Sequence, residues 1–314
     1  MTASITLTQI NYLLALEKAG SFSKAAEKCF VTQSTLSTMI KKLENQVGFS
    51  LFNRNSKPIT MTEEGLLLLN QFRRIQLEAD NLQELIQEAK NEFYGTIRIG
   101  IIPTVAPFLL PLFLEKLIEN CPKVNFSIDE ITTQEIISRI KERELDLGIL
   151  SLPLGDKELV EHSLYFEEFH VFDARRPDVK SKYKVKDIDP DRLWLLEEGH
   201  CMTTQIEKIC HLRAQKQFNN NLVYNSGSIL SLLELVKSNK GITLIPHLAT
   251  LRKYLFEEDC IYTFGAPVPV REIGIITHPN FAKKRLLTIL IKEISRVVKP
   301  LLNKRKKVQV IKPY

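Results

Sequence analysis

The chain has 314 residues, of which 44% are hydrophobic and 25% charged, with a formal net charge of +6. This composition is typical of a soluble globular protein of two or three domains, and the modest positive charge is compatible with binding nucleic acid. Because the opening MTASITLTQI does not resemble an export signal, no apolar run approaches the ~18 residues of a membrane helix, and the five cysteines do not form a secreted-type disulfide framework, we expect a cytoplasmic protein with reduced thiols and no membrane partner.

The first 62 residues predict three short helices followed by a β-wing. Thr8 is the predicted N-cap of the first helix, and either Ser21 or Ser23 that of the second. Thr32 caps the third helix, QSTLSTMIKKLENQ, which Gly48 closes. The apolar residues of this helix recur at 4-3-4 spacing and predict its buried face: Leu36, Ile40, Leu43 and Val47.

Polar and basic side chains of this segment suit DNA. Gln33, Ser34, Ser37 and Lys41 gather toward the N-terminal half of the third helix, where short polar side chains can meet base edges in a major groove. Residues 1–62 hold seven basic and three acidic residues, so four of the six net positive charges lie in about a fifth of the chain. A solvated helical bundle is the alternative.

The stretch SFSKAAEKCFVTQSTLSTMIKKLENQVGFSLFNR resembles the winged helix-turn-helix of LysR-type transcriptional regulators. The resemblance implies that Gln33 and its neighbours contact the bases of double-stranded promoter DNA, and that the wing lies at or near the minor groove. The candidate DNA-contacting residues are Thr32, Gln33, Ser34, Ser37, Lys41, Arg54, Lys57 and Pro58.

Residues 63–94 predict one long helix that forms a dimer. Thr62 followed by Glu63 and Glu64 marks its N-terminus, since acidic residues in the first turn suit the helix dipole. Apolar residues then recur with the 3.5-residue period of a coiled coil. An amphipathic helix packed on its own domain is the alternative. The residues assigned to dimerisation are Leu68, Phe72, Ile75, Leu82 and Ile86. A dimer would offer two recognition helices to a palindromic operator.

From residue 95 onward, predicted strands alternate with helices, which indicates parallel βαβ architecture. The predicted strands are TIRIGII, VNFSIDEI, DLGIL, EEFHVFDA, NLVYN, GITLIP and REIGIIT. We expect two α/β subdomains joined by crossover strands, one of about residues 95–167 and 268–300 and one of about 168–267, with a ligand site at the strand C-termini. This is similar to the effector domain of the same family, a relative of periplasmic binding proteins. The basic tail KRKKVQVIKPY is expected to be solvated.

The run GHCMTTQIEKICH places Cys201 and Cys210 eight intervening residues apart, each beside a histidine. A metal site is one reading, although metal ligands usually sit in loops of two to four residues. Two incidental thiols are a second, and a transient redox pair in a reducing compartment is a third. The residues alone leave these readings open.

Four further stretches resemble the peroxide-sensing branch of the LysR-type family, so that the resemblance covers essentially the whole chain. They are WLLEEGHC with its eight-residue gap to the next Cys, GIIPTVAPFLLP, EITTQEII and VREIG. The resemblance implies that Cys201 is the peroxidatic thiol and Cys210 the resolving one. It also implies that hydrogen peroxide is held by Thr104, Thr133, His200, Gln205 and Arg271. A thiolate would attack the peroxide and form a sulfenic acid, which condenses with the second thiol.

The resulting interpretation is a peroxide-responsive transcription factor, not an enzyme, with no cofactor and no bound metal. Its expected partners are promoter DNA, further copies of the chain in a dimer or tetramer, hydrogen peroxide and RNA polymerase. A regulator that binds a small metabolite and a thiol peroxidase are the alternatives. Thr203 and Thr204 depart from the branch's usual Arg and Asp, and Cys29, Cys121 and Cys260 are interpreted as structural.

Overall fold

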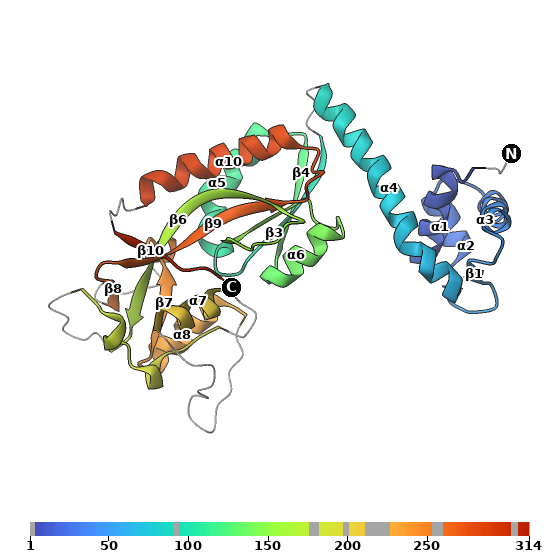
Figure 1. Ribbon diagram of the computed structural model, residues 1–314. Coiled ribbons are helices and arrows are strands. Elements are labelled where there is room, and N and C mark those ends of the chain that lie inside the picture. The colour runs from blue at the N-terminus through green and yellow to red at the C-terminus, as the bar shows by residue number, and fades with distance from the viewer. Residues whose placement is uncertain are drawn as a thin grey trace. The chain divides into compact units, whose positions relative to one another are not determined.

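A computed structural model describes residues 4–90, 94–175, 182–196, 201–210, 227–252, 260–302 and 307–313 of the chain. They belong to two compact units, Met1–Lys90 and Asn91–Tyr314 (Figure 1). Among the described helices, none is both long and apolar enough to cross a membrane.

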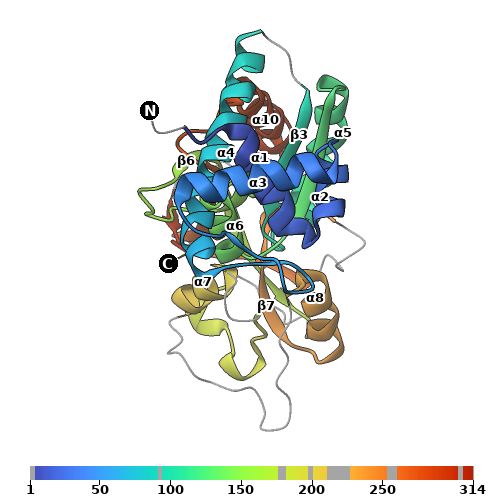
Figure 2. The ribbon, with the colours of Figure 1, turned by 90° about the vertical axis from the view of Figure 1, so that its right-hand side faces the viewer.

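The first unit begins with three helices, α1 (Leu7–Ala19), α2 (Phe22–Lys28) and α3 (Gln33–Val47), which lie together in Figure 2. The Thr32 side chain caps α3 and Gly48 ends it in a left-handed conformation, as predicted. The prediction of Thr8 as the first N-cap is wrong. Thr6 caps α1 instead, because the Gln9 side chain reaches back to its backbone and completes a capping box.

The predicted face of α3 is buried against the other helices, with Leu36, Ile40 and Leu43 fully inaccessible. A short antiparallel wing of β1 (Phe52–Asn53) and β2 (Thr60–Met61) follows. These elements form the winged helix-turn-helix that the sequence predicted.

The long helix α4 (Glu63–Ala89) belongs to this unit, and its apolar residues divide into two groups. Phe72, which was assigned to dimerisation, is 4% exposed because it packs in the unit's own core. Ile75, Leu82 and Ile86 remain 37%, 58% and 42% exposed. The heptad pattern therefore contributes to an intramolecular core at one end of the helix and to a free apolar surface beyond it.

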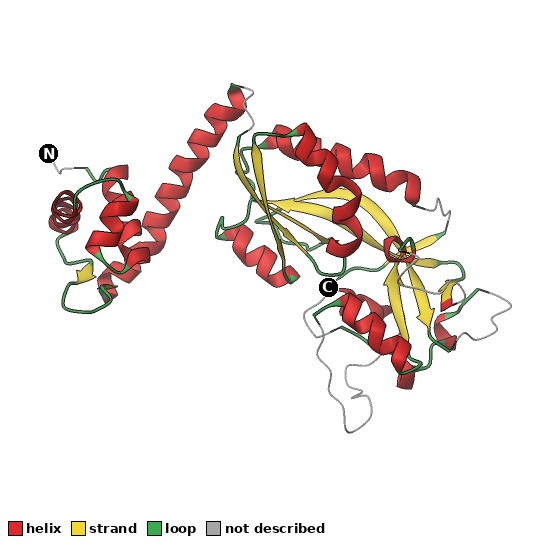
Figure 3. Cartoon of the chain, turned by 180° about the vertical axis from the view of Figure 1, so that it is seen from behind, coloured by secondary structure: helices red, strands yellow, loops and turns green. Residues whose placement is uncertain are grey.

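The second unit opens with the predicted parallel strands, β3 (Gly95–Ile101), β4 (Val124–Glu130) and β5 (Leu147–Leu152). Helix α5 (Ala106–Asn120) connects β3 to β4, and α6 (Thr133–Lys141) connects β4 to β5. Since β3 lies between β4 and β5, right-handed crossovers place these helices on opposite faces of the sheet, as Figure 3 shows.

Two long strands, β6 (Val160–Asp173) and β9 (Val268–Thr277), pair antiparallel and run from one subdomain into the other. These are the predicted crossover strands. In the second subdomain, β7 (Ile242–Pro246) and β8 (Ile261–Thr263) pair antiparallel to β6, where the sequence pattern had indicated parallel strands. Two of the described α-helices lie between β6 and β7 in the sequence, so the alternation of strands and helices did not distinguish an antiparallel pair from a parallel one. The expected strand NLVYN lies outside the described residues.

The remaining helices pack around these strands. They are α7 (Cys201–Cys210), α8 (Ile229–Ser238), α9 (His247–Thr250) and α10 (Lys284–Val298), with 3-10 turns at Val185–Asp187, Pro190–Arg192 and Lys299–Leu301. Helix α10 covers the first subdomain beside α5.

The C-terminal tail is folded, which corrects the prediction of a solvated terminus. Strand β10 (Val308–Val310) pairs parallel with β9, and the backbone N–H of Ile311 donates to the carbonyl oxygen of Val270 at 2.8 Å. Ile311 is 6% exposed within the core of the unit. The prediction was based on the basic residues that precede Val308 in the sequence, and it did not identify Val308–Val310 as a strand.

Candidate functional site

Residues far apart in the sequence meet at one edge of the effector sheet. Thr104 follows β3, Thr133 begins α6 directly after β4, and Ser151 lies near the end of β5. The carboxyl ends of adjacent parallel strands share one edge, where ligand sites of open α/β sheets form. Arg271 reaches the same edge from β9, because its neighbour Glu272 pairs with Leu152 at the end of β5.

Arg271 is the buried cation of this site, with 1% of its surface exposed. Its Nη1 donates to the Thr104 hydroxyl at 3.0 Å and its Nη2 to the Thr104 carbonyl at 3.1 Å. Glu167 on β6 accepts from Nε at 3.0 Å and from Nη2 at 2.9 Å, and this ion pair is 1% exposed on both sides. The geometry fixes the guanidinium and balances its charge.

The sequence interpretation missed Glu167. Its other carboxylate oxygen accepts from the backbone N–H of Leu248 at 2.8 Å, so the side chain ties β6, β9 and α9 together. The sequence feature that could have pointed to Glu167 is an acidic residue at the start of the otherwise mostly apolar predicted strand EEFHVFDA. A buried carboxylate requires a charged or hydrogen-bonding partner.

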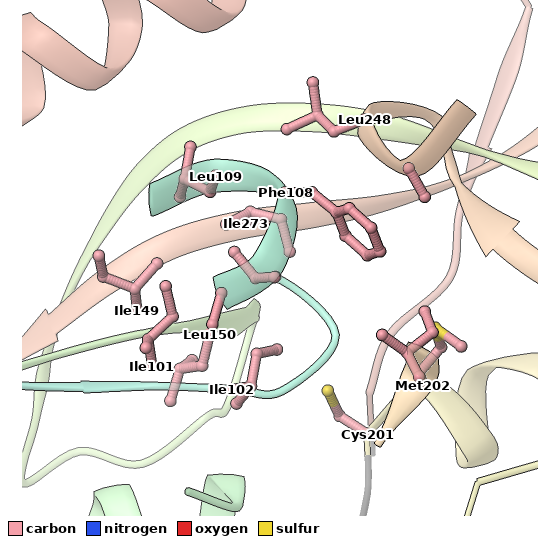
Figure 4. Packing of buried hydrophobic residues seen from close by; sticks show 14 of the residues in the cluster. Ile101, Ile102, Phe108, Leu109, Ile149, Leu150, Cys201, Met202, Leu248 and Ile273 are labelled. Atoms are coloured by element: carbon pink, nitrogen blue, oxygen red, sulfur yellow. The ribbon is translucent and has the colours of Figure 1, made fainter. Parts of the chain in front are cut away.

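Cys201 begins α7 and is 3% exposed, with its sulfur pointing toward the side of Ile102 (Figure 4). Burial raises the pKa of its thiol. This effect outweighs four that lower the pKa: the charge of Arg271, the hydroxyl of Thr133, and the backbone N–H groups of Ser151 and Met202. The groups expected to stabilise a thiolate are therefore present, although burial opposes their effect on the pKa of the thiol.

Two buried polar atoms beside the thiol have unused hydrogen-bonding capacity. Gln205 is fully buried and uses both amide hydrogens, donating to Ser151 Oγ at 3.1 Å and to the carbonyl oxygen of Ile311 at 2.7 Å. Its Oε1 has no partner among the described residues. Thr133 Oγ1 likewise has no partner of hydrogen-bonding geometry there, although it is near enough to lower the pKa of Cys201. A small molecule that both donates and accepts could satisfy both atoms.

Cys210 ends the same helix, and burial raises the pKa of its thiol to about 12. Both cysteines are free. Nine helical steps of ~1.5 Å separate their Cα atoms by about 13 Å and turn the side chains to opposite faces. A disulfide requires Cα atoms within about 7 Å, so bond formation requires α7 to unwind.

Of the five residues predicted to hold peroxide, the structure brings four to this edge, namely Thr104, Thr133, Gln205 and Arg271. His200 and His211, the histidines next to the two cysteines and the other candidate ligands of a metal site, lie outside the described residues. The Thr203 hydroxyl donates a hydrogen bond to the nearby Leu196 carbonyl at 3.1 Å.

The predicted DNA-contacting face is largely exposed in the first unit. Exposed members are Thr32, Gln33, Ser34, Lys41, Arg54, Lys57 and Pro58, whereas Ser37 is half-buried. Ser23 Oγ donates to Gln33 Oε1 at 2.9 Å and so orients the Gln33 amide. Arg54 forms an ion pair with the buried Glu44 at 2.7 Å, which gives it a second role in anchoring the wing to α3.

Comparisons with known families match both units. Residues 7–66 match the "Bacterial regulatory helix-turn-helix protein, lysR family", and residues 90–298 match the "LysR substrate binding domain". The matches confirm the family resemblance and the fold class predicted from the sequence: a winged helix-turn-helix, a long helix, and an α/β effector unit of two subdomains.

Individual relatives agree with this. The chain is 30% identical to the "HTH-type transcriptional regulator EstR" of Acinetobacter baylyi over 300 residues, 95% of this chain and 98% of the relative. It is 29% identical to a "Hydrogen peroxide-inducible genes activator" of Dickeya chrysanthemi over 278 residues, 88% and 90% of the two chains. A solved full-length OxyR variant of Pseudomonas aeruginosa superposes with a TM-score of 0.72 at 27% identity, covering 93% of this chain and 98% of that one.

Proposed function

The chain belongs to the LysR family of bacterial helix-turn-helix regulators, and from this we propose that it is a transcriptional regulator that senses hydrogen peroxide through Cys201 and Cys210. The observation that supports the signal best is the surroundings of Cys201. The buried thiol is influenced by a fixed cation and by the Thr133 hydroxyl, and Gln205 Oε1 on the same helix has no hydrogen-bond partner among the described residues. Hydrogen peroxide is small enough for a buried site, and it both donates and accepts hydrogen bonds.

The proposed chemistry has two steps. The Cys201 thiol first loses its proton, and the thiolate attacks one peroxide oxygen. The O–O bond breaks, the sulfur is oxidised to a sulfenic acid, and the other oxygen leaves as hydroxide and becomes water with the released proton. The Cys210 sulfur then attacks the sulfenic sulfur, which forms the disulfide and releases a second water.

The surrounding residues have distinct proposed roles. Arg271 and the Thr133 hydroxyl stabilise negative charge on the attacking sulfur and on the departing oxygen. Thr104 holds one edge of the guanidinium through its hydroxyl and carbonyl groups. Gln205 offers Oε1 as an acceptor for a peroxide hydrogen. His200 stays a predicted member of this set.

As a regulator, the protein would bind promoter DNA in the cytoplasm through two or more copies of α3. The exposed apolar residues of α4 supply a surface for the dimer. A tetramer and a contact with RNA polymerase are further parts of the proposal.

The test is a non-reducing peptide map after one equivalent of hydrogen peroxide. The wild-type chain should yield a disulfide between the peptides of Cys201 and Cys210. Cys201→Ser should form neither the sulfenic acid nor the disulfide, whereas Cys210→Ser should accumulate the sulfenic acid. Cys121→Ser, which changes a buried cysteine that we assign no redox role, is the control.

Other outcomes identify the alternatives. A promoter response to peroxide that survives in Cys201→Ser would rule out the proposed thiol, and a response to a small metabolite in that variant would favour a metabolite-binding regulator. Sustained peroxide turnover with an added thiol donor would favour a thiol peroxidase.

A further inference from the structure

The C-terminal segment, residues 307–313, joins the two elements that hold the reactive residues. On one side it pairs with β9: Val268 N–H donates to the Lys307 carbonyl at 3.1 Å, and Ile311 N–H donates to the Val270 carbonyl at 2.8 Å. Val270 directly precedes Arg271 in the sequence. The segment is therefore in register with the strand that supplies the buried cation.

On its other side the segment contacts α7. The Gln205 amide donates to the Ile311 carbonyl at 2.7 Å, and the Lys208 ammonium group donates to the Lys312 carbonyl at 3.3 Å. Both contacts use carbonyl groups of the segment and side chains of the helix between the two cysteines. An unwinding of α7 would therefore have to break them.

The contact with Ile311, together with that to Ser151, determines which way the Gln205 amide faces. An amide has two N–H donors and one oxygen acceptor. Here both donors are used, one by Ser151 Oγ and one by Ile311 O. If the amide were turned over, its oxygen would face the Ile311 carbonyl, and two acceptors would repel each other. The Ile311 carbonyl thus favours Gln205 Oε1 as the amide atom without a partner among the described residues, one helical turn from Cys201 on the same face of α7.

We propose that the C-terminal segment is part of the peroxide site, with Ile311 as a positioning residue that makes Gln205 present a hydrogen-bond acceptor to the substrate of Cys201. The inference rests on the proposed function, and it adds a role for a segment far from both cysteines in the sequence. Without the segment, the Gln205 amide is held only by its hydrogen bond to Ser151 Oγ, and α7 loses two tertiary hydrogen bonds.

The experiment compares full-length protein with a chain that ends after Lys307 and with Ile311→Pro, which removes the N–H donated to Val270. Ile311→Val keeps the docked strand and tests rescue by a similar residue. Gln309→Ala, at an exposed position of β10, is the matched control. For each chain, the rates of Cys201 oxidation by hydrogen peroxide and of its alkylation by iodoacetamide are measured.

Truncation and Ile311→Pro should slow oxidation by about three- to tenfold, the effect expected of one lost hydrogen bond. Alkylation does not need an acceptor at Gln205, so it should not slow. Ile311→Val and Gln309→Ala should behave as wild type. In a Gln205→Leu background the truncation should slow oxidation no further, because its effect passes through that amide. An unchanged oxidation rate in the truncated chain, or an equal loss with both reagents, would overturn the inference.

Hydrogen exchange separates this inference from the proposed function. Truncation should accelerate amide exchange in α7 of the reduced protein, whether or not peroxide is the signal. Unchanged exchange would overturn the role of the segment alone. Failure of wild-type Cys201 to react with peroxide would instead overturn the proposed function, and the positioning role with it.

Discussion

The pKa of the Cys201 thiol is subject to opposing influences, of which burial and the charge of Arg271 are the largest. Burial raises the pKa of the thiol, while the charge of Arg271 lowers it. That charge is not free to act alone, because Glu167 forms a buried ion pair with the same guanidinium. Oxidation and alkylation of Cys201 should both accelerate as the pH rises, since the thiolate is the reactive form.

Glu167→Gln tests this balance. Removal of the negative charge should strengthen the effect of Arg271, lower the pKa of Cys201 and shift the pH profile of alkylation to lower pH. The protein should also lose about 3–5 kcal/mol of stability, because the amide leaves the buried charge of Arg271 unpaired and one of three donors without an acceptor. Glu272→Gln is the control. It removes the same charge from the residue next to Arg271 on β9, and adjacent residues of a strand point to opposite faces of the sheet. An unmoved pH profile would show that Glu167 does not moderate the cation.

At the DNA surface, Gln33 is the residue proposed to read a base. Gln33→Ala should cost about 1–3 kcal/mol at one base pair and relax specificity there, as measured by binding to a set of single-substitution operators. Ser23→Ala should lose part of the same discrimination, because Ser23 orients the Gln33 amide. Equal loss of affinity for every operator would contradict the base-reading role.

The resemblance of short sequence stretches to a known family pointed to the residues proposed for the site's chemistry, Cys201, Arg271 and Gln205 among them. It did not predict Glu167 or Ile311. Their roles arise from partners 104 and 106 residues away, which only the folded sheet brings into contact.

At the scale of elements, α4 shows the limit of a repeating pattern. Phe72 and Leu82 occupy the same predicted heptad seam, yet the first is in its own unit's core and the second is 58% exposed. A 3.5-residue period indicates that one face of the helix is apolar. It does not indicate whether that face packs against the same chain or against a second copy. The sequence analysis also did not identify strand β10. Only three residues form it, and the basic residues around them led to the prediction of a solvated tail.

Leu82→Asp should weaken the dimer, since it places a charge on the exposed apolar part of α4. Sedimentation at micromolar concentration should show dissociation, and operator affinity should fall with it. Gln83→Asp adds the same charge at the adjacent exposed position and should leave the oligomer intact. An unchanged oligomer in Leu82→Asp would mean that another surface joins the subunits.

For the molecule as a whole, positive charge is concentrated in the predicted DNA-binding segment and not in the first unit as a whole, because the acidic residues of α4 offset most of it. Four of the six net positive charges lie in the first 62 residues, which suits phosphate contacts there, while the effector unit holds the thiols. If Cys201 is the sensor, as proposed, we expect its signal to reach the DNA through a change in the arrangement of subunits.

We expect closure of the disulfide to supply that change. A loop of this size contributes only about 3 kcal/mol, which is enough to bias an element of marginal stability. Unwinding α7 exposes or repacks its buried residues, Met202 and Ile206 among them, and breaks the bonds to Ile311 and Lys312. Footprints on promoter DNA should therefore differ between reduced and oxidised wild-type protein and revert with dithiothreitol. Cys210→Ser, which can form only the sulfenic acid, should keep most of the reduced footprint. Identical footprints in the two redox states, with the disulfide verified in the oxidised sample, would show that oxidation is not transmitted to the DNA-binding units.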